Sequence, residues 1–169
     1  VLWGRAGILD AMPPWQGGGG MIRSVGATSS TYREAPTRFE AGTPNVIGIA
    51  GLGAAIEYTH AIELRTVHSD EARAHRALLA VIRAAGGRIL GAPELALVAF
   101  ELPRVHPHDI ASLADGEGVA LRSGHHCAAP LHHRFGVAAP ARVSVACYTG
   151  DDDVAQFAQA LAKIREVFP

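Results

Sequence analysis

The chain has 169 residues, of which 49% are hydrophobic and 18% are charged, and its formal net charge is −1. This composition is typical of a globular protein with enough residues for one domain and a modest core. A net charge near zero, without a basic stripe, makes nucleic acid and anionic membranes poor candidate partners. No apolar run approaches the length of a membrane-spanning helix.

Residues 1–45 are rich in turn-forming residues and differ from the rest of the chain. Glycine and proline are concentrated at residues 13–20 and again at 42–44, which predicts loops. Two short segments between them, residues 21–25 and 30–35, are predicted to pair as a hairpin. The first residues lack an initiator Met and the regions of a signal peptide, so we expect the chain to continue from something that precedes it.

Two helices are predicted in the next part of the chain. Residues 45–64 carry apolar side chains at helical spacing, with Asn45 as the cap. Residues 68–87 are predicted to form a second helix, in which Ser69 is the cap, acidic residues follow it, and Gly86 ends the helix.

The remaining residues mix strands and helices. Strands are predicted, in chain order, at residues 88–90, 95–102, 119–121 and 141–148. Helices are predicted at residues 106–118, beginning near Pro107, and at 151–168, which has acidic residues in its first turn. Because the order lacks regular strand–helix–strand units, we expect an α+β fold with helices on one face of a small sheet.

The segment RSGHHC, residues 122–127, contains the most chemically reactive groups. Cys127 follows a predicted strand, a glycine and two histidines, and nearby positive charge favours the reactive thiolate. The residues alone leave three interpretations of Cys127 open: a nucleophile, a small packed thiol, or a metal ligand. The metal alternative would recruit His125, His126, His132 and His133. It lacks a CxxC pair, and adjacent histidines on an extended loop point in opposite directions.

Two further segments allow either a functional or a purely structural interpretation. Residues 39–45, FEAGTPN, lead into the first predicted helix, and their glycine and the Thr43 hydroxyl suit a phosphate as well as a plain helix-entry loop. Arg142 begins an apolar strand, where it is either a clamp for a carboxylate or an edge residue whose charge reaches solvent. His106 and His108 are expected to be exposed at the start of a helix.

The chain has two cysteines, Cys127 and Cys147. They could form one disulfide, but two cysteines do not make a disulfide framework, and a reducing cytoplasm fits better. We therefore expect a cytoplasmic protein that keeps both thiols reduced.

Taken together, these segments resemble the second part of cysteine desulfurases of the SufS-like branch. These enzymes use pyridoxal 5'-phosphate and belong to the class V aminotransferase-like group. The resemblance covers essentially the whole chain, and its order and spacing are carried by residues 12–22, 38–45, 51–58, 108–131 and 141–148.

The resemblance implies a division of the chain into two parts. Residues 46–169 would form the small C-terminal domain of a fold-type I enzyme, with helices packed on a small, largely antiparallel sheet. Residues 1–45 would be the loop- and hairpin-rich end of the large cofactor-binding domain.

The resemblance also implies roles for individual residues. Cys127 matches the thiol that takes sulfur from L-cysteine and becomes a persulfide, with L-alanine as the other product. Arg142 matches the arginine that grips the substrate carboxylate, and Arg122 matches the arginine before the cysteine loop. Gly42 and Thr43 match the turn that, in the family homodimer, reaches the cofactor phosphate of the partner subunit.

Partners follow from the same resemblance: L-cysteine, a second copy of the chain, and a sulfur-acceptor scaffold protein of iron–sulfur cluster assembly. His108, in the HPHD segment, matches a variant in members that hand sulfur to a zinc-containing scaffold. The family's cofactor-binding lysine lies before the matching segment, and Lys163 matches nothing in the family pattern. We therefore expect the parent protein to be a desulfurase and this chain alone to be inactive.

Three alternatives stay open beside this interpretation. A selenocysteine lyase, or another class V enzyme, would share most of these residues and differ in its substrate. A non-enzymatic sulfur-relay or dimerisation module would use Cys127 only to accept sulfur from another protein. A zinc-binding module would hold a metal ion in the histidine-rich segment.

Overall fold

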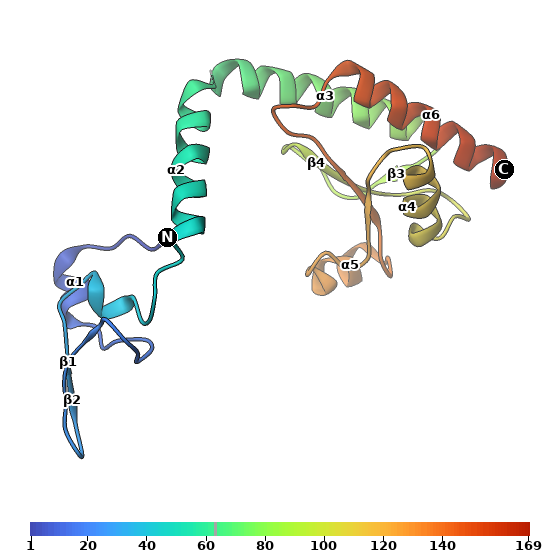
Figure 1. Cartoon of the computed structure of the whole chain (residues 1–169). Helices are drawn as coiled ribbons and strands as arrows, with labels where there is room; N and C mark the ends of the chain where they lie inside the picture. The colour runs from blue at the N-terminus through green and yellow to red at the C-terminus, as the bar shows by residue number, and fades with distance from the viewer. Residues whose placement is uncertain (63) are drawn as a thin grey trace. The chain divides into compact units, whose positions relative to one another are not determined.

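The computed structural model describes residues 1–62 and 64–169, which form two compact units (Figure 1). The first unit is Val1–Ala61 and the second is Ile62–Pro169. The contacts within each unit group the helix after residue 45 with the first unit. The division expected from the sequence put that helix with the second part.

The first unit consists of short elements followed by one long helix. Its elements are α1 (Ala6–Ala11), β1 (Ile22–Val25), β2 (Ser30–Tyr32), the 3-10 helix η1 (Thr37–Phe39) and α2 (Val46–Ala61). The two strands pair antiparallel, which confirms the predicted hairpin. Asn45 caps α2 as predicted, because its Oδ1 accepts a hydrogen bond from the Gly48 N–H at 2.9 Å.

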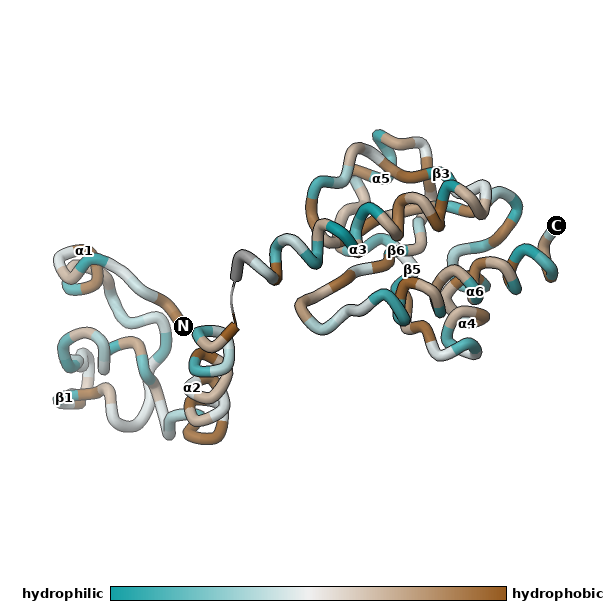
Figure 2. Tube along the Cα trace, turned by 90° about the horizontal axis from the view of Figure 1, so that it is seen from above, coloured by the Kyte–Doolittle hydropathy of each residue, from teal (hydrophilic) through white to brown (hydrophobic). Residues whose placement is uncertain are grey.

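Helix α2 exposes all of its side chains although it is strongly apolar. Its apolar residues lie on every side of the helix, and Figure 2 shows mostly brown and pale segments along it. A helix that is apolar all round is normally buried, whereas every residue of α2 is exposed in this structure. No helix in the described residues, α2 included, is long and apolar enough to cross a membrane.

The second unit combines four helices with one sheet. Its elements are α3 (Leu64–Ala84), β3 (Arg88–Ile89), β4 (Leu97–Glu101), α4 (Pro107–Gly116), β5 (Arg122–Ser123), α5 (Ala129–Phe135), β6 (Ala141–Ser144) and α6 (Asp151–Val167). The strands form an antiparallel sheet in the order β3-β4-β6-β5. This architecture confirms the α+β class and the antiparallel sheet expected from the sequence.

The core of the second unit lies between the sheet and the helices α3, α4 and α6 (Figure 1). Phe100 of β4 meets Phe157 of α6 edge to face, with ring centroids 6.1 Å apart. Alternation along β6 buries Ala141 and Val143 in this core. Because successive side chains of a strand point to opposite faces, Arg142 lies on the other face of the sheet.

Three local predictions were wrong. Helix α3 begins at Leu64, so Ser69 lies within the helix, where its Oγ donates to the Thr66 carbonyl and caps nothing. The strand expected at 119–121 forms at Arg122–Ser123, because pairing with β6 decides its position. The segment after β5, expected to be a loop, contains α5, a helix too short for its periodicity to show in the sequence.

Candidate functional site

The loop between β5 and α5 holds Cys127 in an uncommon backbone conformation. The φ angles are 123° at Gly124, 49° at His126 and 57° at Cys127. Left-handed φ values cost a residue with a side chain roughly 1–3 kcal/mol each. Two such residues in succession, with Cys127 exposed, show that the loop presents the thiol to solvent instead of packing it.

Hydrogen bonds fasten this loop to the residue before β6. The Gly124 N–H donates to the Pro140 carbonyl at 3.2 Å, and the Ala128 N–H donates to the His125 carbonyl at 2.8 Å. The His126 Nε2 atom also lies 3.2 Å from the Pro140 oxygen. Because a carbonyl oxygen only accepts, we assign the ring hydrogen of His126 to Nε2.

The surroundings of His126 disfavour its protonated form. Burial lowers the pKa of His126 below its ordinary value of 6.5, and its hydrogen bond to the backbone carbonyl opposes this. Positive charge on Arg142, His132 and Arg122 lowers the pKa further. The sequence suggested that positive charge on this histidine could favour a thiolate at Cys127, whereas the lowered pKa disfavours a positive charge on its ring.

Arg122 and Arg142 are paired directly across β5 and β6. Directly opposed side chains share one face of a sheet and lie within contact range, where like charges repel. The Arg142 Nε atom is buried and has no hydrogen-bond partner among the described residues. Since β6 lies between β4 and β5, Arg142 is not an edge residue. A carboxylate would satisfy its donor and neutralise the repulsion.

His108 lies beside the strand that leads to Cys127. Its Nδ1 atom is 3.3 Å from the Ser123 Oγ, and its ring stacks on His106 with centroids 5.5 Å apart. Both histidines are exposed, as predicted. The sequence analysis missed that His106 caps α4, with its Nδ1 accepting a hydrogen bond from the His108 N–H at 3.2 Å.

The turn at Gly42 and Thr43 belongs to the first unit. Gly42 has a φ of 87°, and a Cβ added to it would meet no heavy atom within 4 Å. Its N–H donates to the Gly19 carbonyl at 2.9 Å, and Thr43 is exposed shortly before α2. The turn thus offers open space and a hydroxyl next to a helix start, where anions are favoured.

Lys163, the only lysine in the sequence, is engaged elsewhere in the second unit. Its Nζ donates to both carboxylate oxygens of Glu117 at 2.7 Å. An amine held by a carboxylate is not poised to act as a nucleophile. Lys163 therefore has the placement of a surface ion-pair residue.

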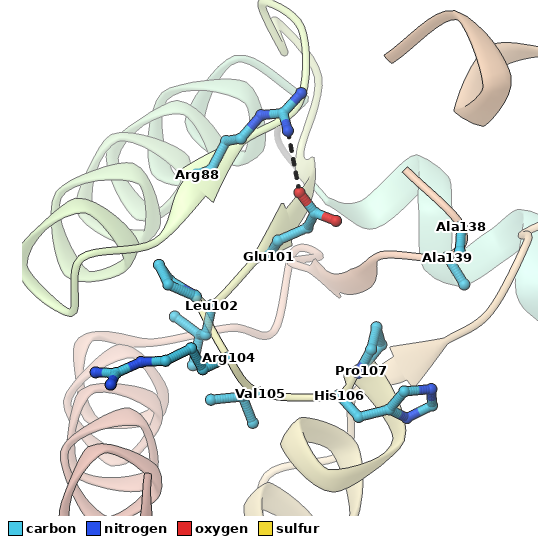
Figure 3. Close-up of a pocket in the computed structure, with 10 residues that line it drawn as sticks. Arg88, Glu101, Leu102, Arg104, Val105, His106, Pro107, Ala138 and Ala139 are labelled. Atoms are coloured by element: carbon cyan, nitrogen blue, oxygen red, sulfur yellow. Dashed lines mark hydrogen bonds and ion pairs between the residues drawn. The ribbon is translucent and has the colours of Figure 1, made fainter. Parts of the chain in front are cut away.

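The loop between β5 and α5, residues 124–128, is called the thiol loop. The hollow drawn in Figure 3 is separate from it. It has a volume of 510 Å³ and lies beside β3 and the start of α4, with Arg88, Glu101 and His106 in its lining. The Arg88 Nη1 atom lies 3.3 Å from the Glu101 Oε2, so these charges neutralise each other. Neither Cys127 nor Arg142 lines this hollow.

The packed-thiol and zinc interpretations of Cys127 find no support in the described residues. Cys127 and Cys147 are both free and exposed, so neither is a core thiol. Across residues 1–62 and 64–169, no group of three or more His, Cys, Asp or Glu side chains is arranged to hold a metal ion. The nucleophile interpretation of Cys127 is the one that the geometry favours.

The structure brings most of the sequence-derived candidates together around β5. These are His108, Arg122, His126, Cys127 and Arg142. Gly42 and Thr43 lie in the other unit. His132, considered from the sequence only as a metal ligand, is buried beside the loop, and nothing in a seven-residue helix signals that burial in advance.

The comparisons with known proteins establish the family to which this chain belongs. Residues 1–157 match the family described as Aminotransferase class-V, and the chain belongs to this family. Among individual proteins, it is similar to the cysteine desulfurase of Dickeya dadantii (strain 3937), with 41% identity over 170 residues that cover 99% of this chain and 41% of that protein.

Two solved structures share the fold at moderate sequence identity. The cysteine desulfurase CsdA (S-sulfonic acid) from Escherichia coli has a TM-score of 0.87 and 34% identity, and the match covers 98% of this chain and 42% of that chain. The apo cysteine desulfurase from Thermococcus onnurineus NA1 has a TM-score of 0.89 and 30% identity, with 97% and 42% covered. The resemblance to cysteine desulfurases is confirmed, and the chain spans about two fifths of the length of these relatives.

Proposed function

We propose that this chain provides the sulfur-accepting part of a cysteine desulfurase site, in which Cys127 takes the sulfur atom of L-cysteine. The observation that carries the proposal is the pairing of Arg122 with Arg142, one loop away from an exposed thiol. An amino acid whose carboxylate binds this pair would bring its side chain towards Cys127.

The proposed reaction needs no external oxidant. The Cys127 thiolate attacks the sulfur of L-cysteine, so that a sulfur–sulfur bond forms while the carbon–sulfur bond breaks. The electron pair of the broken bond stays with the substrate carbon, which takes up a proton, and the products are L-alanine and a persulfide on Cys127. In this reaction Arg142 and Arg122 hold the carboxylate.

Pyridoxal phosphate, when bound, supplies the electron sink that makes carbon–sulfur cleavage feasible. The turn at Gly42 and Thr43 fits the cofactor phosphate, because the turn has open space, an exposed hydroxyl and a helix start. In the proposal, this phosphate belongs to the cofactor of the partner subunit. Lys163, paired with Glu117, does not fit the covalent anchor. We therefore expect the 169 residues alone to have no desulfurase turnover.

The test measures L-alanine formed from L-cysteine by a polypeptide that joins these residues to a cofactor-binding lysine. Cys127→Ala is expected to abolish alanine formation, whereas Cys147→Ala should retain it. Equal activity in the Cys127→Ala variant would contradict the assignment.

The 169-residue chain with added pyridoxal phosphate is expected to form no alanine. Turnover that depends on Cys127 would contradict the expectation that this chain alone is inactive. Replacing cysteine by selenocysteine in the same assay separates a desulfurase from a selenocysteine lyase.

The persulfide must be passed to an acceptor, and we assign this acceptor to iron–sulfur cluster assembly. His108 is exposed and contacts Ser123 at the base of the thiol loop, which suits a contact residue for an incoming scaffold protein. Two free thiols in one chain fit a reducing compartment such as the cytoplasm.

A homodimer is part of the proposal and is supported by α2. Ile47 of this helix is 87% exposed, and covering such a surface with a second copy removes apolar area from water. We expect Ile47→Glu to weaken self-association of the chain about tenfold or more, as measured by sedimentation equilibrium. Val167→Glu, at an exposed apolar position of α6, is the matched control and should have no effect. Unchanged association in Ile47→Glu would contradict this use of α2.

A further inference from the structure

Helix α5 inverts the usual distribution of polar and apolar residues. His132 is buried, with 5% of its surface exposed, whereas the neighbouring Leu131 is 50% exposed. A buried imidazole normally makes hydrogen bonds, because an unpaired buried polar group is costly. The His132 Nδ1 atom finds no partner among the residues that the structure describes. Packing alone would favour leucine at the buried position, so the histidine requires another explanation.

His132 lies directly against the thiol loop. Its ring centroid is 6.1 Å from that of His125, with the planes 27° apart, and 6.1 Å from that of His126, with the planes 84° apart. These two histidines immediately precede Cys127. A cavity of 260 Å³ opens beside them, lined by His125, His132 and His133 among others. One buried ring therefore contacts both side chains that lead to the thiol.

The loop conformation needs such support. His126 and Cys127 have φ values of 49° and 57°, which residues with a side chain adopt only when their surroundings hold them there. The backbone of His132 is itself fixed at the exit of the loop. Its backbone N–H donates to the Ala128 carbonyl at 3.2 Å, and its backbone carbonyl accepts from the Val137 N–H at 3.1 Å.

The ring also belongs to a group of interacting charges. The titratable and charged groups around His126 and His132 are His125, His126, His133, Arg122 and Arg142. Positive charge on His132 contributes to the lowered pKa of His126, after the larger effects of burial and Arg142. Loss of the His132 ring would therefore change both the packing of the loop and the electrostatic environment of His126.

We propose that His132 is a positioning residue of the thiol loop, whose buried ring, in contact with His125 and His126, fixes the conformation in which Cys127 is exposed and reactive. This inference deepens the proposed function, because the thiol is the one to which we assign sulfur transfer. Its test is independent of that function, since thiol reactivity can be measured without cysteine or cofactor.

The test measures alkylation of Cys127 by iodoacetamide in the 169-residue chain over a range of pH, using mass spectrometry of the cysteine peptides. Cys147, an exposed thiol of the same unit, is the internal standard. His132→Leu is expected to lower the Cys127-to-Cys147 rate ratio at neutral pH about threefold or more and to move the Cys127 pH profile. His132→Asn keeps a polar group near the Nδ1 position and should restore the ratio towards that of the unaltered chain.

Arg134→Leu, at an exposed position of the same helix, is the matched control and should leave the ratio unchanged. Urea unfolding of each variant checks that it is folded. If His132→Leu unfolds, His125→Ala removes the contact from an exposed residue and is expected to lower the ratio as well. The proposal would be overturned if the folded variant that removes this contact kept the Cys127 ratio and pH profile of the unaltered chain. An equal effect of Arg134→Leu would also overturn it.

Discussion

At the scale of single residues, the pairing of Arg122 with Arg142 has a measurable energetic consequence. Like charges in direct opposition destabilise a sheet by roughly 0.2–1 kcal/mol. We expect Arg122→Gln to raise the free energy of unfolding by about this amount at low salt, and salt at about 1 M to reduce the gain through screening. Urea unfolding measures both. Arg134→Gln, at an exposed arginine of α5, should show no such gain, and a salt-independent loss in Arg122→Gln would contradict the repulsion.

The lowered pKa of His126 predicts how stability depends on pH. Above the ordinary pKa of 6.5, His126 is neutral in both the folded and the unfolded chain, so burying its ring does not reduce the free energy of unfolding. As the pH falls below 6.5, the unfolded chain binds a proton that the folded chain does not, so stability decreases towards the folded pKa. We expect His126→Asn, which tolerates a left-handed φ, to reduce this decrease, as measured by thermal unfolding at several pH values.

His133→Asn is the control for this pH dependence, since it removes an exposed histidine of the neighbouring helix. It should leave the decrease of stability below pH 6.5 unchanged. If His126→Asn and the unaltered chain lose stability equally over this range, burial of His126 is not the cause.

The role of Arg142 shows what the sequence could and could not predict at this scale. A charged residue at the start of an apolar strand is compatible with an edge position or with a carboxylate clamp. The decision depends on which strands lie on either side, and β4 and β5 come from distant parts of the sequence. The resemblance supplied the clamp as an expectation, and the pairing with Arg122 supplied a physical reason for it.

At the scale of elements, α6 contributes most visibly to the core of the second unit. Phe157 is buried and meets Phe100 edge to face. We expect Phe157→Ala to lower the free energy of unfolding by about 3–5 kcal/mol, because it removes a large buried side chain and leaves a cavity. Val167→Ala on the same helix, where Val167 is 60% exposed, should change it by less than about 0.5 kcal/mol. Similar small changes in both variants would contradict this packing.

Long periodic helices were predictable, whereas short elements set by tertiary pairing were not. The helices α3 and α6 show their buried faces in the sequence, although α3 begins earlier than expected because Ser69 does not cap it. Strand β5 has two residues, and its position depends on register with β6. Helix α5 was missed for the same reason, and with it the burial of His132.

At the scale of the whole molecule, the candidate site residues are divided between two units. The thiol loop and the arginine pair belong to the second unit, whereas the turn at Gly42 and Thr43 belongs to the first. Helix α2, which is apolar and exposed along its whole length, belongs to the first unit. The resemblance put the boundary between the two parts after residue 45, whereas the contacts within the structure put it after Ala61.

The central claim is that Cys127 is a sulfur-accepting thiol, and sulfur transfer from L-cysteine persulfide tests it most directly. In this transfer the Cys127 thiolate attacks the outer sulfur of the donor, a Cys127 persulfide forms, and L-cysteine leaves as the thiol. The chain is incubated with the donor, and its remaining thiols are then blocked. Mass spectrometry of the peptides that contain Cys127 and Cys147 measures the mass of an added sulfur atom. We predict that Cys127 acquires sulfur in preference to Cys147 and that Cys127→Ser abolishes this signal. An equal or greater yield on Cys147 would contradict the account.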